Sequence, residues 1–302
     1  MKKIIRIAAV SLGAIGLAAC SPGEKAQEAP APAEDATETA SAPEASSEAL
    51  RLYTFDCGRI DMLDLGLFSS NGEYAGRQNK AADMCFLIRH PKGDLMWDAG
   101  LPDSFHEQEG GVTNGPFRVA VPTTLASQLA SIDVAPADIE YFSISHSHFD
   151  HVGNAAMFVG ATFLVDKDER AYMFRDEARA DEQTFPLVAL LEDAPTTEFD
   201  GDYDVFGDGS VTILAMPGHT PGHTSLLVNL ENTGPVLLTG DLYHLLESRE
   251  KHIVPTFNTD EEETLRSMDK FEALAAETGA RVVVQHALED MEKMPKAPEY
   301  LD

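Results

Sequence analysis

Basic residues are scarce in this sequence: 22 lysines and arginines stand against 51 aspartates and glutamates, and the formal net charge is −29 at pH 7. Such a surface repels nucleic acids and anionic substrates at long range, so we expect no nucleic-acid partner and a small neutral substrate. The glycine-rich loops that bind nucleotides and the turn that carries a nucleophilic serine are missing. Only three cysteines occur, and none has metal-site spacing.

The first twenty residues have the pattern of an export signal. Three basic residues precede the uncharged, mostly apolar stretch 7–19, which at 13 residues is too short to span a bilayer. The stretch ends in Leu17-Ala18-Ala19-Cys20, which resembles a bacterial lipoprotein signal that is cleaved before the cysteine. We therefore expect a membrane anchor of acyl chains on Cys20 and a place in the bacterial cell envelope, as a periplasmic or outer-membrane lipoprotein. An ordinary secretory signal is the alternative.

The rest of the chain divides by composition. Residues 20–50 are rich in Ala, Pro, Glu, Ser and Thr and have almost nothing that could form a core, so we expect a disordered tether. Residues 51–302 are long enough for one large domain with a substantial core. The sequence leaves the oligomeric state open, with a homodimer among the options.

The segment Ser145–His151 contains three imidazoles and one carboxylate. Neighbouring histidines are costly to bury unless a cation satisfies them together. The preceding six residues have the pattern of a buried strand, and alternate residues of an extended segment point the same way. His146 and His148 can therefore share one ion, whereas Asp150 and His151 come after the chain begins to turn and can face a neighbouring position.

Three further ligand-type residues follow strand-like segments downstream. His219 lies in a Pro-Gly-His-Thr-Pro-Gly-His turn after the strand-like Ser210–Met216. Asp241 ends an apolar run, and His286 ends a β-branched run. Because the pattern of a strand followed by a ligand repeats, we expect these residues and the Ser145–His151 segment to converge at the edge of one sheet.

This succession, HxHxDH and then a turn histidine, a strand-end aspartate and a strand-end histidine, resembles the metallo-β-lactamase superfamily over roughly residues 51–302. The resemblance implies an α/β fold, the αββα sandwich, with a two-metal site along one edge. It implies that one ion binds His146, His148 and His219, that the second binds Asp150, His151 and His286, and that Asp241 bridges them. His223 matches a position that is not a ligand, and we expect it to support the site.

The donor set predicts the cofactor. Imidazole nitrogen and carboxylate oxygen suit zinc at roughly 2.0–2.2 Å, so we expect two Zn²⁺ ions, although other divalent transition metals could bind. Two ions about 3.5–4 Å apart would hold a water and bring its pKa toward about 7, and the resulting hydroxide would attack the substrate. By analogy with the family, Asp150 is also expected to pass a proton to the leaving group.

Within the superfamily, a bridging aspartate such as Asp241 is typical of glyoxalase II, RNase Z and the quorum-quenching lactonases. Too few residues follow His286 for the region with which glyoxalase II grips glutathione, and the acidic charge does not suit RNA. Four stretches resemble the N-acyl homoserine lactonase branch: Phe55–Ile60, Leu95–Pro102, Ser145–His151 and Pro298–Leu301. The resemblance therefore implies a dinuclear metal hydrolase that opens the ring of N-acyl homoserine lactones or similar lactones. The alternatives are an esterase, phosphotriesterase or β-lactamase of the same fold, and a non-catalytic metal-binding or sensing lipoprotein.

Some supporting residues have two interpretations. Some members of the branch place a tyrosine three residues after the bridging aspartate, where this sequence has His244, preceded by Tyr243. Either side chain is a candidate catalytic donor to the substrate oxygen, and Tyr243 could equally be structural. Asp98, at a strand end, is a candidate to orient a metal-bound histidine, or a turn-forming residue before Gly100.

Two cysteines and two loops are also open to interpretation. Cys57 and Cys85 lie in strand-like segments that could be adjacent and bridged, but we favour two buried free thiols, since cysteine packs well as a small hydrophobe. The segments Gly66–Lys80 and Pro102–Pro122 mix turn residues with aromatics. They are candidate walls of an acyl-chain pocket, or packed surface loops.

Overall fold

The structure is a computed structural model that describes residues 49–302. The predicted signal (1–19) and nearly all of the predicted tether (20–50) lie outside the described residues. No helix within residues 49–302 has both the length and the apolar character needed to cross a bilayer.

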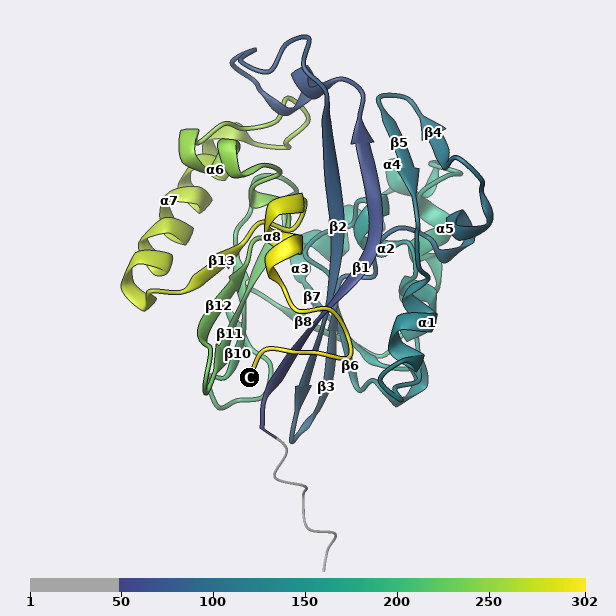
Figure 1. Cartoon of the computed structure of the whole chain (residues 1–302), viewed down its shortest axis with the longest axis vertical. Helices are drawn as coiled ribbons and strands as arrows, with labels where there is room; N and C mark the ends of the chain where they lie inside the picture. Colours follow the sequence, from purple (N-terminus) through teal and green to yellow (C-terminus); the bar gives the residue numbers. More distant parts are fainter. Residues whose placement is uncertain (1–48) are drawn as a thin grey trace, which may run out of the picture. The chain divides into compact units, whose positions relative to one another are not determined.

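Two β-sheets form the centre of the fold (Figure 1). The larger sheet has the strand order β4-β5-β1-β2-β3-β6-β7-β8, and the smaller has the order β13-β12-β11-β10-β9. The strands of the larger sheet are β1 (Arg51–Met62), β2 (Asn79–His90), β3 (Gly93–Trp97), β4 (Val112–Asn114), β5 (Phe117–Ala120), β6 (Tyr141–Ser143), β7 (Thr162–Asp166) and β8 (Thr196–Phe199). Those of the smaller sheet are β9 (Tyr203–Asp204), β10 (Val211–Ala215), β11 (Thr224–Leu230), β12 (Gly234–Leu238) and β13 (Arg281–Val283).

Along the chain, the α-helices alternate with these strands. They are α1 (Leu125–Ala130), α2 (Phe149–Val152), α3 (Lys167–Met173), α4 (Asp176–Arg179), α5 (Phe185–Val188), α6 (Leu246–Lys251), α7 (Glu261–Thr278) and α8 (Leu288–Lys293). Helix α7 begins where the Asp260 side chain accepts a hydrogen bond from the backbone N–H of Glu263, and it ends at Gly279, whose φ is +65°. Both are standard signals for the start and the end of a helix.

Alternating side chains sort the strands into layers. In β2, Met84 and Phe86 point into the core between the two sheets, whereas Cys85 and Leu87 point to the outer face of the larger sheet. Leu129 of α1 packs on that outer face, whereas Met268 and Phe271 of α7 pack on the outer face of the smaller sheet (Figure 1). The layers therefore run helix, sheet, sheet, helix, which is the predicted αββα sandwich.

The ligand segments come from both sheets. Strand β6, which leads to His146, belongs to the larger sheet, whereas β10, β12 and β13, which lead to the other ligands, belong to the smaller sheet. The expectation that they share the edge of one sheet is therefore wrong. The stacking of two sheets roughly 10 Å apart brings the ends of both sets of strands to one end of the sandwich.

Cys57 and Cys85 form a disulfide between β1 and β2, with their Cα atoms 5.8 Å apart. The expectation of two free thiols is therefore wrong. The register of β1 and β2 passes from Asp56 opposite Met84 to Gly58 opposite Asp83, so that Cys57 is the extra residue of a β-bulge. The bulge, which the sequence pattern did not reveal, places Cys57 within reach of Cys85.

Candidate metal centre

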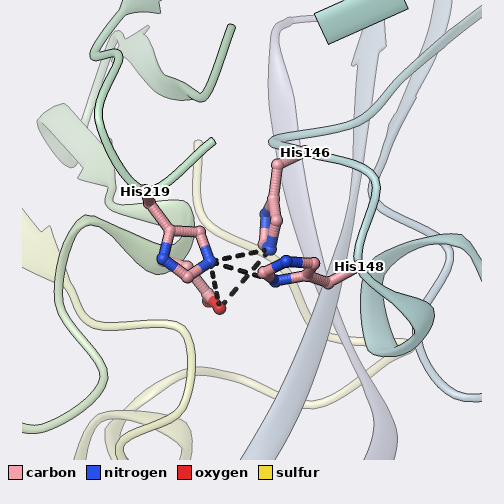
Figure 2. Close-up of side chains that lie close together, drawn as sticks. His146, His148 and His219 are labelled. Atoms are coloured by element: carbon pink, nitrogen blue, oxygen red, sulfur yellow. Dashed lines mark hydrogen bonds and ion pairs between the residues drawn. The ribbon is translucent and has the colours of Figure 1, made fainter. Parts of the chain in front are cut away.

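Three imidazoles meet at the end of the sandwich. His146 and His148 follow β6, and His219 follows β10. His219 Nε2 lies 3.2 Å from His146 Nε2 and 3.1 Å from His148 Nδ1. Figure 2 shows the three rings pointing toward one another. The structure thus brings together all three predicted ligands of the first ion.

The predicted ligands of the second ion form an adjacent group. Asp150 and His151 lie on the short helix α2, and His286 follows β13. His286 Nε2 lies 3.3 Å from His151 Nε2 and 3.8 Å from Asp150 Oδ2. The donor atoms of each group all lie within 4.8 Å of one another, which is compatible with one metal ion per group.

Asp241 stands between the two groups and presents one oxygen to each. Its Oδ2 lies 3.5 Å from the Nε2 atoms of His146 and His219. Its Oδ1 lies 3.2 Å from His151 Nε2 and 2.8 Å from His286 Nε2. A carboxylate in this position can bridge two cations.

The residues fit a pair of metal ions. Two nitrogens bound to one tetrahedral zinc lie roughly 3.3 Å apart, because each Zn–N bond is about 2.0–2.1 Å, and the imidazole nitrogens here have that spacing. The Oδ1 atom of Asp241 is buried and is left without a satisfied hydrogen bond within the described residues, although the Nε2 atoms of His151 and His286 lie 3.2 and 2.8 Å from it. A divalent cation in each group would satisfy these atoms together.

Hydrogen bonds at the second ring nitrogen orient three of the ligands. His219 Nδ1 donates to Asn258 Oδ1 at 2.8 Å, and His286 Nδ1 donates to the carbonyl oxygen of Ala82 at 2.8 Å. His151 Nδ1 pairs with Asp98 Oδ2 at 2.9 Å. Each bond leaves Nε2 free to face a cation. The structure thus places Asp98 in the orienting position, the first of its two predicted roles.

His223 lies beside the ligands but uses both ring nitrogens elsewhere. Its Nδ1 donates to the carbonyl oxygen of Met216 at 2.9 Å, and its Nε2 accepts from the backbone N–H of Asp241 at 2.9 Å. Burial lowers the pKa of His223 to about 4, so the ring stays neutral. This geometry agrees with the expected supporting role.

The two groups differ in their affinity for protons. Burial lowers the pKa of His146 and His219 well below the usual value, and the neighbouring histidines add to the effect. Burial also opposes a charge on His151 and His286, but Asp241 outweighs it, raising the pKa of His151 well above its usual value and that of His286 to about 9. The first group is thus neutral at pH 7, and the second holds protons that a metal ion must displace.

Glu169 joins the two loops that carry the first group, and the sequence analysis missed it. This buried residue of α3 accepts hydrogen bonds from the backbone N–H and the hydroxyl of Ser147, at 2.8 and 2.7 Å. It also accepts from the Thr220 hydroxyl at 2.5 Å and the Gly222 N–H at 3.3 Å. A single glutamate in a helix has no sequence signature, so only its burial and its contacts reveal the role.

A cavity of about 340 Å³ opens directly onto the ligands. Its wall is largely apolar, and the floor includes Asp150, Asp241 and His286. The apolar wall consists of Ile60, Met62, Leu67, Phe68, Phe117, Phe149 and Phe257. Phe68 and Phe117 come from the two predicted wall segments, whereas Tyr74 and Phe105 of those segments do not line the cavity.

His244 lines this cavity and Tyr243 does not. His244 Nε2 lies 3.0 Å from Asp241 Oδ2, and its ring packs edge-on against Phe68. Tyr243 is fully buried, and its hydroxyl donates to Glu272 Oε1 of α7 at 3.0 Å. Of the two candidate donors, the structure therefore places only His244 where a substrate could reach it, because adjacent residues of an extended chain point in opposite directions.

Comparison with known proteins agrees with this geometry. Residues 83–286 match the metallo-beta-lactamase superfamily. The chain belongs to this superfamily. This hydrolase is 34% identical over 262 residues to the N-acyl homoserine lactonase AttM of Azorhizobium caulinodans. The alignment covers 84% of this chain and 99% of that protein. It is 28% identical to the N-acyl homoserine lactonase AiiA of Bacillus thuringiensis subsp. kurstaki, over 83% of this chain and 98% of that one.

A solved structure of an N-acyl homoserine lactone hydrolase, with the product N-hexanoyl-L-homoserine bound at the catalytic metal center, matches with a TM-score of 0.70. It is 26% identical and covers 84% of this chain and 99% of that one. The predicted superfamily, its lactonase branch and the αββα fold are confirmed, and the chain is a metal-dependent hydrolase.

Proposed function

We propose that this hydrolase uses two zinc ions to open the lactone ring of N-acyl homoserine lactones. One observation carries the proposal: two groups of metal-ligand side chains, joined by Asp241, form the floor of an apolar cavity of about 340 Å³. A lactone that carries an acyl chain has the matching distribution of polarity, with a reactive polar ring at one end and an apolar tail. Relatives named for this activity share most of their length with the chain.

The cavity and the charge of the protein both suit such a substrate. The acyl chain would lie against Phe117 and Phe149, since burial of each methylene contributes about 0.8 kcal/mol. The lactone itself is neutral, so the net charge of −29 does not oppose its approach. A phosphodiester would meet repulsion from the same surface.

The side chains around the cavity have separate roles in the proposed reaction. When bound, two divalent ions supply a water that loses its proton near neutral pH and a positive charge that polarises the carbonyl. His244 lies where it can donate to the carbonyl oxygen as negative charge develops there. Asp150, at the floor, is placed to give a proton to the ring oxygen when the ring C–O bond breaks. Lactone and water thus yield an N-acyl homoserine, with one new hydroxyl, one new carboxylate and one released proton.

A substrate panel tests the proposal. The zinc-loaded full chain is assayed on an N-acyl homoserine lactone, an aryl ester, a phosphotriester and a β-lactam, with Asp241→Asn as the metal-site control. We expect the highest kcat/KM on the lactone and at most residual turnover in Asp241→Asn. A larger kcat/KM on one of the other three substrates would reassign the activity. No turnover of any substrate by protein with both ions bound would favour a binding or sensing role.

We also propose that the chain is held at the cell envelope by acyl chains on Cys20. The lipoprotein-like Leu17-Ala18-Ala19-Cys20 supports this, and so does the Cys57–Cys85 disulfide, because disulfides persist mainly in oxidising compartments. Labelled palmitate supplied to producing cells should enter the wild-type protein and not the Cys20→Ser variant. Equal labelling of both, or of neither, would count against the anchor.

A further inference from the structure

The Cys57–Cys85 disulfide lies directly beneath a loop of the metal centre. Both cysteines are buried, and they join β1 and β2 on the outer face of the larger sheet. A Cβ atom added to Gly100 would lie 2.3 Å from Cys57 Cβ and 2.8 Å from Cys85 Sγ. The backbone of Gly100 therefore rests on the bridge with no room even for a methyl group.

The loop that rests on the bridge also contacts helix α2. The carbonyl oxygen of Gly100 accepts a hydrogen bond from the backbone N–H of Gly153 at 2.7 Å. The backbone N–H of Ala99 donates to the carbonyl oxygen of His151 at 2.8 Å. A Cβ atom on Gly153 would lie 2.3 Å from the Gly100 oxygen, so Gly153 packs against the loop as closely as Gly100 packs against the bridge. The bridge, the loop and α2 therefore form one continuous stack.

The far side of this stack carries ligands of the second ion. Helix α2 bears Asp150 and His151, and the loop begins with Asp98, whose carboxylate orients the His151 ring. The first group is supported differently. His148 and His219 lie in loops that Glu169 joins. Of the first group, His146 is linked to Asp98 through the Ser145 hydroxyl, which lies 2.9 Å from Asp98 Oδ2 and 3.1 Å from His146 Nδ1.

We propose that the disulfide is a positioning element for the second metal group, and that its reduction selectively weakens metal binding by Asp150, His151 and His286. Two thiol sulfurs are not bonded and need more room than a disulfide, and Gly100 occupies the space into which they would expand. A displacement of Gly100 moves Asp98 and α2 together through the hydrogen bonds that join them. The inference rests on the proposed metal centre, but not on which lactone is the substrate.

The test measures zinc affinity in the oxidised and reduced full chain. A water-soluble phosphine reduces the bridge: phosphorus takes the oxygen of one water molecule to become the oxide, and the two sulfurs take the two hydrogens as thiols. Zinc binding is then followed by competition with a chelating dye, and native mass spectrometry counts the ions. The Cys57→Ala/Cys85→Ala variant, treated with the same phosphine, corrects for any effect of the reagent on zinc.

Reduction should raise the dissociation constant of one zinc ion about tenfold or more, the effect expected when the orientation of a ligand is lost, and that of the other less than threefold. If the bridge only stabilises the fold, its reduction should lower the Tm of the metal-free protein and change neither dissociation constant. That result would overturn the inference and leave the proposed metal centre standing. Oxidised wild type that binds no zinc would overturn the proposed centre together with the inference.

Discussion

His151 and Asp98 form a fully buried pair, with His151 Nδ1 2.9 Å from Asp98 Oδ2, although 53 residues separate them in sequence. Asp98 adopts a φ of +60°, a left-handed conformation that is uncommon outside glycine. Its carboxylate also accepts from the Ser145 N–H at 2.6 Å and from Gln285 Nε2 at 2.7 Å. One aspartate that is not a ligand thus connects three segments of the metal centre.

The Asp98→Asn variant should bind the second zinc ion ten- to a hundredfold more weakly, because the amide cannot hold the His151 ring as the carboxylate does. Zinc competition with a chelating dye measures the change. Asp94→Asn is the matched control: Asp94 lies in β3, the strand that precedes Asp98, and is paired with Arg89, so this variant should keep both affinities. Unchanged zinc binding in Asp98→Asn would show that the buried pair does not orient the ligand.

The Glu169→Gln variant should destabilise the loops of the first group. All four groups that contact Glu169 are donors, so the NH₂ of glutamine would face a donor and leave it unsatisfied, at a cost of about 1–3 kcal/mol. Denaturant unfolding measures this loss, and zinc competition should show weaker binding by the His148 and His219 group. Glu177→Gln, at an exposed position on α4, should change neither quantity.

The His244→Phe variant should lower kcat about a hundredfold while both metal ions stay bound, since loss of one donor to a developing oxyanion typically has that effect. Steady-state kinetics with a metal count provides the measurement. Tyr243→Phe is the neighbouring control: it removes the hydrogen bond to Glu272, which costs about 1 kcal/mol of stability, and should leave kcat unchanged. If Tyr243→Phe lost activity and His244→Phe kept it, the assignment of the two residues would be reversed.

Zinc binding by the two groups should depend differently on pH. In the metal-free protein the pKa of His286 is raised to about 9 and that of His151 is also raised, so the second group must release protons when it binds zinc at pH 7. Its affinity should therefore increase as the pH rises toward about 9, whereas the first group, with lowered pKa values, should bind without proton release. Calorimetry in buffers of different ionisation enthalpy counts the protons. Equal proton release in both binding steps would contradict this.

Much of the site could be predicted because its signals are local. The spacing of His146, His148, Asp150 and His151 within one segment indicated two groups of candidate ligands before any fold was known. Glu169 and Asn258 carry no such signal, since each acts only through a partner from a distant segment. The expectation that all the strands before the ligand-type residues belong to one sheet was wrong for the same reason. No single strand's sequence indicates which sheet the strand joins or how the two sheets stack.

The sequence by itself determined the superfamily, the seven ligand-type residues and the apolar runs that become the sandwich, because all of these depend on residue type and short-range spacing. Only the tertiary structure decided that Cys57 and Cys85 are bridged, that His244 rather than Tyr243 faces the cavity, and that Asp98 orients His151. Each of these depends on a bulge, a side-chain direction or a contact between distant segments, and such features arise only when the chain has packed.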